Sequence, residues 1–151
     1  MKAIGIIRES NAVDKHVDTK MISPLTMAYM GDAIFELFVR DQLVTRSEIP
    51  VNKLHLKAIE YVKAASQAKI AHVLKNQLTE EEQWMVRRGR NQKSTAPKNA
   101  ELSEYRYATG FEALIGYLYY QNKTERMLHI MTKGMEILDE RHGGEKADES
   151  Q

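Results

Sequence analysis

The chain has no cysteine among its 151 residues, which excludes disulfide bonds and zinc sites built on thiolates. The absence of cysteine is typical of a reducing compartment, so we expect the protein in the cytoplasm. The sequence also lacks an apolar run near the roughly 18 residues that a membrane-spanning helix requires. The N-terminal apolar run has five residues and stops at Arg8-Glu9, which is too short for a signal peptide. We expect no association with a membrane.

Several catalytic patterns are missing as well. None of the five histidines is followed by aspartate, and no His-x-x-x-His or Glu-x-x-His pair occurs, which argues against His-Asp metal phosphohydrolases and against zinc. No glycine-rich phosphate loop is present, so nucleotide-driven chemistry is not indicated. Strand-like alternation never extends beyond four residues, and no internal repeat is found. The sequence therefore predicts an all-α fold in one domain.

Capping signals divide the chain into helices. Ser23-Pro24 places serine at an N-cap and proline at the first helical position, and Thr79 to Glu82 matches a capping box. The predicted helices cover about 24–44, 51–77 (with a possible junction near 61–65), 79–88, 103–121 and 124–140. Residues 89–100 form a turn-rich loop, and Gly143-Gly144 ends the last helix. We expect an N-terminal arm (1–20), a folded domain (21–140) and a polar, disordered C-terminal tail (141–151).

Two acidic residues stand where the helical pattern calls for apolar side chains. Glu112 lies within Phe111–Tyr120, the most apolar stretch of the chain, and Asp32 lies within Met27–Val39. A buried carboxylate is costly without compensation, so it is normally paired, protonated or bound to a metal. If the two helices pack face to face, the carboxylates meet and offer oxygen ligands for a hard cation. Two alternatives stay open at this point: Asp32 after Gly31 fits a helix N-cap, and Glu112 fits a buried ion pair.

The net charge is only +1, but the charges are unevenly distributed. Residues 51–100 hold ten Lys/Arg against four Glu, whereas residues 101–151 hold six against ten acids. The segment Trp84–Asn99 contains no acid and carries five basic residues, which are Arg87, Arg88, Arg90, Lys93 and Lys98. This composition is typical of a loop that contacts phosphate groups, and a merely solvated loop is the alternative. We predict an RNA-binding role for these five side chains.

Four separated blocks of the sequence resemble the ribonuclease III family. Leu25–Glu36 resembles the signature helix of its catalytic domain, and Tyr107–Gly116 resembles its second metal-binding helix, in the same order and spacing. Arg88–Asn99 and Tyr105–Tyr107 are similar, more narrowly, to the Mini-ribonuclease III branch, which has no double-stranded-RNA-binding domain. The resemblance covers about residues 21–140 of 151, so we expect no extra domain.

The resemblance implies a homodimer of ribonuclease III-like all-α catalytic domains that hydrolyses double-stranded RNA with Mg²⁺. Asp32 and Glu112 would be the catalytic residues and the metal ligands, with one site for each RNA strand. The implied substrate is the 23S ribosomal RNA precursor, and the resemblance also allows a ribosomal protein that presents this substrate. Leu25, Tyr29 and Phe35 would supply apolar surface at the subunit interface.

The chain departs from the family at two positions that bear on metal binding. Ribonuclease III enzymes generally carry four acids per active site, whereas Ala28 and Thr109 stand here one turn before Asp32 and Glu112. Because residues three or four apart share a helix face, Ala28 and Thr109 would line the site without adding charge. The reduced set looks like the pattern of the Mini branch and implies sparser metal coordination.

Two other functions are compatible with the residues. A non-catalytic RNA-binding or ribosome-assembly module on the same fold would explain Ala28 and Thr109, and it predicts binding without cleavage. A helix-turn-helix DNA-binding protein would use the five lysines within residues 51–75, but it leaves Asp32 and Glu112 unexplained.

Overall fold

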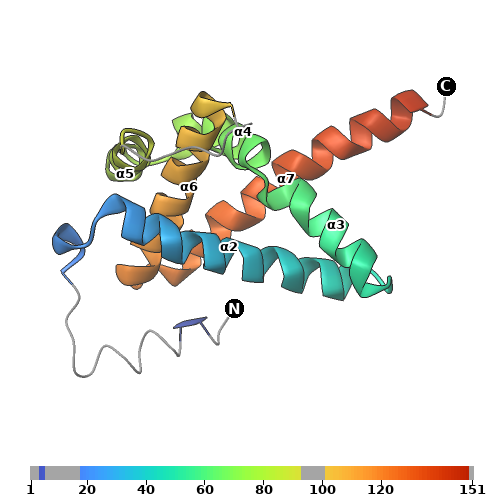
Figure 1. The fold of residues 1–151 in the computed structure, drawn as a ribbon, viewed down its shortest axis with the longest axis horizontal. Helices are drawn as coiled ribbons and strands as arrows, with labels where there is room; N and C mark the ends of the chain where they lie inside the picture. Colours follow the sequence, from blue (N-terminus) through green and yellow to red (C-terminus); the bar gives the residue numbers. More distant parts are fainter. Residues whose placement is uncertain (1–3, 6–17, 93–100, 150–151) are drawn as a thin grey trace.

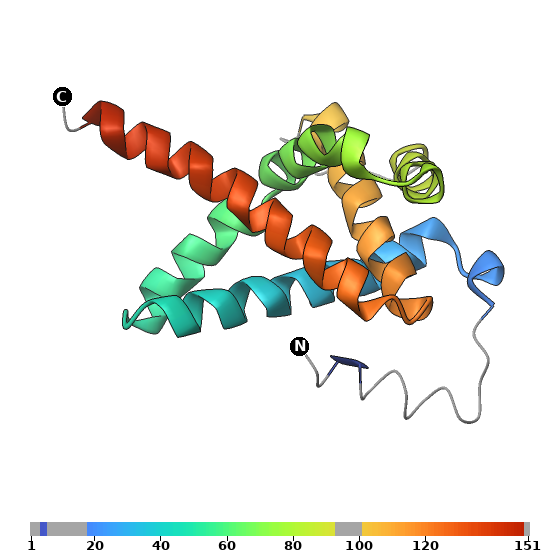
Figure 2. The same cartoon turned by 180° about the vertical axis from the view of Figure 1, so that it is seen from behind.

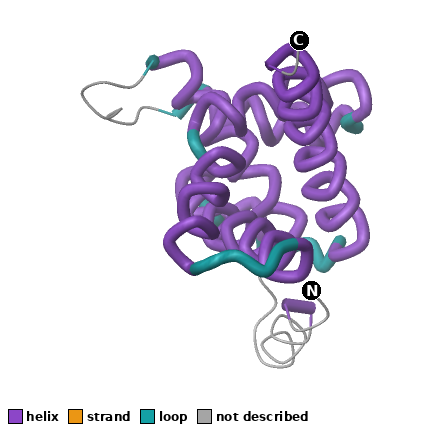
Figure 3. Tube along the Cα trace, turned by 90° about the vertical axis from the view of Figure 1, so that its right-hand side faces the viewer, coloured by secondary structure: helices purple, strands orange, loops and turns teal. Residues whose placement is uncertain are grey.

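The computed structural model describes residues 4–5, 18–92 and 101–149, and the side chains of these ranges up to Glu140. The α-helices are α2 (Pro24–Arg46), α3 (Val51–Val62), α4 (Ala64–Leu74), α5 (Glu80–Arg90), α6 (Leu102–Tyr120) and α7 (Thr124–Glu149). Two short 3₁₀ helices, η1 (Thr19–Met21) and η2 (Lys75–Gln77), precede α2 and α5. The described residues contain no strand, as Figure 3 shows, which confirms the all-α prediction.

The helix starts agree with the capping signals in the sequence. Ser23 accepts a hydrogen bond from the backbone N–H of Thr26 at 3.1 Å, and Pro24 is the first residue of α2. The capping box at the start of α5 is formed by Thr79 and Glu82 in both directions. Lys63, with φ −62° and ψ 154°, separates α3 from α4, which confirms the predicted junction. Local side-chain chemistry therefore sets where these helices begin.

Three helix ends differ from the prediction. α7 continues through Gly143-Gly144 to Glu149, so the expected end at these glycines is wrong, as is a disordered tail over these residues. Glycine costs only about 1 kcal/mol in a helix interior, and it keeps the N–H that proline lacks. α5 includes Gly89 and runs to Arg90, and α2 runs to Arg46. α5 and α7 therefore continue past the glycines that were taken as their ends, whereas α2 ends directly before the predicted break at Ser47.

Two other predictions concern segments that are described only in part. Of the predicted loop at residues 89–100, the part from 93 to 100, which includes Lys93 and Lys98, lies outside the described residues. Of the expected N-terminal arm, Ile4 is buried in the hydrophobic core, with 7% of its surface exposed. Residues 1–3 and 6–17 lie outside the described ranges. In its described part, the arm contacts the domain through Ile4 and through Thr19, whose hydroxyl accepts a hydrogen bond from Gln121.

α6 lies at the centre of the helical domain. It crosses α2 and also packs against α4 and α5, while α7 covers the opposite face, as the two views in Figures 1 and 2 show. Eleven residues of α6 are buried, and Phe111 meets Phe35 of α2 edge to face, with ring centroids 5.1 Å apart. Among the described helices, none is both long and apolar enough to cross a membrane. The core therefore forms around α6.

The backbones of α2 and α6 touch where the two helices cross. A Cβ atom on Gly31 would lie 1.8 Å from the carbonyl oxygen of Glu112, and one on Gly116 would lie 2.0 Å from that of Met27. No side chain larger than hydrogen fits at either position, because real Cβ contacts are never this short. This reciprocal pair of glycines brings the segment that holds Asp32 against the segment that holds Glu112.

Candidate active site at the crossing of α2 and α6

Asp32 lies in the middle of α2, directly after the glycine at the helix crossing. The helix runs without a break from Pro24 to Arg46, so the alternative reading of Asp32 as an N-cap is wrong. Its side chain is exposed to solvent at the mouth of a cavity. Glu112 lies in the middle of α6, and it is half-buried at the same cavity. The fold therefore brings together two carboxyl groups that are 80 residues apart in the sequence.

The carboxyl pair has an unusual protonation equilibrium. Burial raises the pKa of Glu112 to about 9, and the negative charge of Asp32 and a hydrogen bond between the two carboxyl groups act in the same direction. Among the described residues, no Lys or Arg forms an ion pair with Glu112, so the alternative of a buried salt bridge is wrong. Without a cation, Glu112 stays protonated at neutral pH, and its carboxyl O–H donates the hydrogen bond to Asp32.

The cavity has a volume of about 330 Å³ and is lined by residues of α2, α3, α4 and α6. Ala28 and Thr109 line it, as their spacing from the two acids predicted. The Thr109 hydroxyl donates to the carbonyl oxygen of Tyr105 at 2.9 Å, so it is engaged within its own helix. The charge available to a ligand in this cavity therefore comes from Asp32 and Glu112.

Gln67 of α4 also lines the cavity, and the sequence analysis missed it. The residue is 2% exposed, and its Nε2 donates to the carbonyl oxygen of Val62 at 2.8 Å. Its Oε1 is buried and has no hydrogen-bond partner among the described residues. The sequence does carry a signal for this residue, which is a polar side chain in an apolar row, as for Glu112. Gln67 shares the helix face of the buried Ile70 and Leu74.

These residues fit a hard divalent cation. Carboxylate and amide oxygens are the ligands that Mg²⁺ and Ca²⁺ prefer, and Mg²⁺ usually takes one or two carboxylates and keeps several waters. No group of three or more His, Cys, Asp or Glu side chains with metal-binding geometry occurs in the described part of the chain, which disfavours an all-protein cage. A cation beside both carboxylates would also offset the burial and the repulsion that keep Glu112 protonated.

The predicted RNA-contacting arginines lie in the last two turns of α5. Arg87 and Arg90 line a second cavity of about 100 Å³, together with Lys75, His72 and Tyr107. Arg90 donates to the hydroxyl of Tyr107 at 3.2 Å, and this ring packs on that of His72, with centroids 4.1 Å apart. Among the described residues, no acid lines this cavity. Arg88 lies apart from it, over the ring of Trp84 at 4.7 Å. We call this second cavity the basic cavity.

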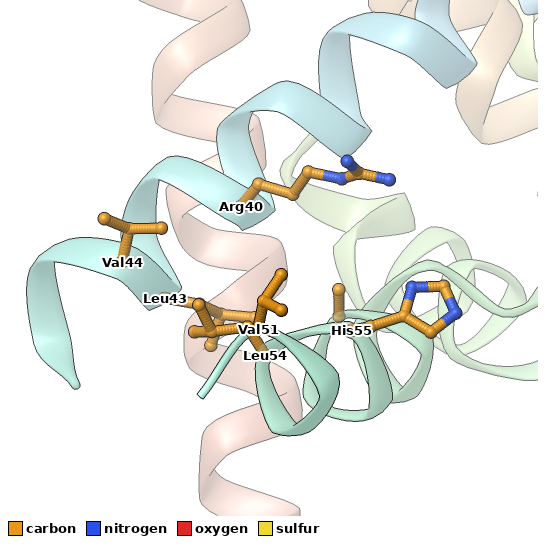
Figure 4. A pocket seen from close by; sticks show the side chains of 7 residues that line it. Arg40, Leu43, Val44, Val51, Leu54 and His55 are labelled. Carbon is orange, nitrogen blue, oxygen red and sulfur yellow. The ribbon is translucent and has the colours of Figure 1, made fainter. Parts of the chain in front are cut away.

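A third cavity lies between the C-terminal half of α2 and the start of α3. It has a volume of about 250 Å³, and Figure 4 shows the side chains that line it, which are largely apolar. Val44 and Val51, at its edge, are 61% and 79% exposed. This feature was not predicted. It leaves apolar side chains of α2 and α3 in contact with solvent.

Comparison with known proteins supplies the family. A family model, "Ribonuclease III domain", matches residues 25–123, which include both acids of the site. The chain belongs to the ribonuclease III family. Proteins named "Mini-ribonuclease 3" from Thermoanaerobacter sp. (strain X514) and Symbiobacterium thermophilum are 46% and 48% identical over 79% and 78% of this chain, and the matches cover 84% and 92% of those proteins. Membership in the ribonuclease III family makes the protein an endoribonuclease.

A solved structure supports the same assignment. The crystal structure of a Fusobacterium nucleatum protein matches with a TM-score of 0.70 and 30% sequence identity, over 79% of this chain and 96% of that one. The Mini-ribonuclease 3 of Staphylococcus aureus is 40% identical over 87% of this chain. The resemblance stated from the sequence is therefore confirmed at the level of the family and of its Mini branch. Neither the non-catalytic module nor the DNA-binding protein is favoured by these relatives.

Proposed function

We propose that this endoribonuclease cleaves double-stranded RNA and depends on Mg²⁺ held by Asp32 and Glu112. The observation that carries the proposal is the carboxyl pair in one cavity. Glu112 is half-buried, hydrogen-bonded to Asp32, and without a cationic partner among the described residues. Such a pair is unfavourable on its own and favourable around a divalent cation.

The two carboxylates have different tasks in this mechanism. When held by these residues, Mg²⁺ would lower the pKa of a water and would stabilise negative charge on the phosphate. Asp32 is exposed at the mouth of the cavity, where a phosphodiester backbone can approach. Glu112 is held deeper by α6 and must release its proton before its carboxylate can act as a ligand. The chain thus presents one accessible and one recessed oxygen ligand to the same ion.

The five basic residues predicted from the sequence are proposed to bind RNA phosphates: Arg87, Arg88, Arg90, Lys93 and Lys98. The basic cavity supports this for Arg87 and Arg90, because its lining contains cations and no acid. Arginine forms charge-assisted hydrogen bonds to phosphate oxygens in a fixed fork geometry. Such contacts would let the catalytic domain bind RNA through its own surface.

We further propose a homodimer. Tyr29 and Leu25 on α2 are 77% and 39% exposed, and the cavity of Figure 4 leaves further apolar side chains of α2 and α3 in contact with solvent. Phe35 does not contribute, because it is buried in the chain's own core, which corrects the expectation for this residue. Sedimentation should give twice the 17.4 kDa of one chain at micromolar concentration. A monomer under these conditions would contradict a mechanism in which two sites cut two strands.

The substrate and the setting are proposed from the family resemblance. The substrate is the 23S ribosomal RNA precursor in the cytoplasm, and a ribosomal protein that presents this RNA is a further proposed partner. One experiment tests the activity: incubation of the protein with structured RNA or with duplex DNA, in Mg²⁺ or in EDTA. We expect RNA to be cleaved in Mg²⁺ but not in EDTA, and duplex DNA to stay intact in both. RNA cleavage in EDTA would contradict the metal mechanism, and cleavage of DNA would contradict the substrate class.

A further inference from the structure

Gln67 lies at the junction between α3 and α4. This position accounts for the hydrogen bond of its Nε2 but leaves its Oε1 without a partner among the described residues. α3 ends at Val62, and α4 begins at Ala64, directly after the extended residue Lys63. The Gln67 side chain reaches back from the first turns of α4, and its Nε2 donates to the carbonyl oxygen of Val62. Ser66 does the same for the carbonyl oxygen of Glu60. Both side chains therefore satisfy backbone acceptors at the end of α3.

The orientation of the Gln67 amide follows from this contact. A backbone carbonyl can only accept a hydrogen bond, so the amide nitrogen must face Val62, and the amide oxygen must face away from it. Gln67 Oε1 is the buried side-chain acceptor that is left without a partner in the described ranges. Buried polar atoms are almost always satisfied, so an orphaned one calls for a ligand.

The surroundings of Gln67 indicate which ligand this is. Gln67 lines the same cavity as Asp32 and Glu112, and the three residues come from three helices, α4, α2 and α6. Ala28 and Thr109 leave this cavity short of oxygen ligands, because the alanine has none and the threonine hydroxyl is bonded to Tyr105. An amide oxygen is a good ligand for a hard cation, and it adds no negative charge to a pair that already repels itself.

We infer that Gln67 Oε1 is an uncharged third protein ligand of the divalent cation at Asp32 and Glu112. This inference rests on the proposed function, because it assumes a cation in that cavity. It assigns the side chain two tasks. Nε2 fixes the junction between α3 and α4, and Oε1 fixes the cation relative to α4.

The test is calorimetric titration of the metal-free, full-length protein with MnCl₂, a readout that is independent of RNA cleavage. We expect Gln67→Met, which has similar length and no oxygen, to weaken Mn²⁺ binding by about tenfold or more. Ser66→Ala is the matched control. It removes a hydrogen bond at the same junction, but Ser66 does not line the cavity. This variant should lower the unfolding temperature and leave the affinity for Mn²⁺ unchanged.

Two outcomes separate this inference from the proposed function. If the wild-type protein binds no Mn²⁺, the metal site itself is wrong, and the inference fails with it. If the wild type binds Mn²⁺ and Asp32→Asn does not, but Gln67→Met binds as the wild type does, only the assignment of Gln67 is overturned. Gln67→Glu loses the hydrogen bond to Val62 as Gln67→Met does, but it keeps an oxygen at the same reach, so it separates the two tasks of the side chain. Once circular dichroism shows that it is folded, it should bind Mn²⁺ at least as tightly as the wild type, and weaker binding would overturn the inference.

Discussion

The cavity at the helix crossing and the basic cavity share α4 and α6 but differ in charge. The first is lined by Asp32, Glu112 and the amide of Gln67, and the second by side chains of α4, η2, α5 and α6 that include two arginines and a lysine. Along α4, Gln67 lines the first cavity and His72 the second, and Lys75 of the second cavity follows α4 in η2. Gln67 and His72 lie about 7.5 Å apart along the helix axis. α4 therefore contributes both to a cavity that contains two acids and to a cavity that contains cations.

This difference has a consequence for a polyanionic substrate. RNA phosphates are attracted to the basic cavity by the protein's own charges, whereas the acidic cavity repels them unless a divalent cation is bound. The proposed function thus assigns affinity and chemistry to separate side chains. Changes in the acidic cavity should affect turnover and metal binding, and changes in the basic cavity should affect affinity and its salt dependence.

The largest expected effect is at the acidic pair. Glu112→Gln and Asp32→Asn keep the side-chain shape but remove an anionic ligand, so Mg²⁺-dependent cleavage at saturating RNA should fall by orders of magnitude while RNA binding persists. Glu104→Gln, in the first turn of the same helix, is the control and should cleave normally. Near wild-type cleavage by either variant of the pair would show that the assigned active site is wrong. The difference between the two cavities would then have no bearing on catalysis.

The next largest effect is expected at the helix crossing, which positions Asp32 and Glu112 but not the basic cavity. Gly31→Ala puts a Cβ within 1.8 Å of a backbone oxygen, so α2 and α6 must separate. We expect a loss of about 3 kcal/mol or more in the free energy of unfolding, together with lower cleavage by the folded fraction. In the control Gly134→Ala, the Cβ would meet a side-chain atom of Ile70 at 3.1 Å, which can move. Equal stability of the two variants in denaturant titrations would show that the close crossing is not required.

A smaller effect is expected at the basic cavity. The double variant Arg87/Arg90→Ala should weaken RNA binding with little regard to sequence, and it should flatten the slope of log K against log salt by roughly 0.7 to 0.9 for each lost phosphate contact. Saturated turnover should change less than KM. Arg88→Ala tests the role of the cavity itself, because Arg88 lies outside it against Trp84 and should matter less. An unchanged salt slope in the double variant would mean that this cavity does not bind phosphate.

The last effect is on stability as a function of pH in the absence of metal. The pKa of Glu112 is about 9 in the folded protein against an ordinary value of 4.5, so the folded state binds more protons than the unfolded state between these values. Stability should therefore fall as pH rises through this range. Glu112→Gln should remove this part of the pH dependence and be at least as stable as the wild type at high pH. Thermal unfolding in EDTA across the range measures it, and identical profiles for both proteins would show that Glu112 is not desolvated.

Much of the local structure could be predicted from the sequence. The start of α2 at Pro24, the capping box at Thr79 and the break at Lys63 follow from side chains within a few residues of each feature. The helix ends were predicted less well, because a glycine allows an end without enforcing one. α7 passes through Gly143-Gly144, and α5 continues past Gly89, where a Cβ would lie 2.8 Å from Gly110. That glycine serves the packing of α5 on α6 rather than a turn.

For the candidate site, the sequence by itself determined that Asp32 and Glu112 are polar residues in apolar helices, and the matched motifs assigned them to one family. Only the tertiary structure decided that the two carboxyl groups meet in one cavity, that neither has a cationic partner in the described part of the chain, and that Gln67 joins them from a third helix. The physical reason is distance along the chain. Helix caps depend on neighbours a few residues away, whereas burial, electrostatic repulsion and an unsatisfied amide oxygen depend on which helices touch, and here that is set by Gly31 and Gly116.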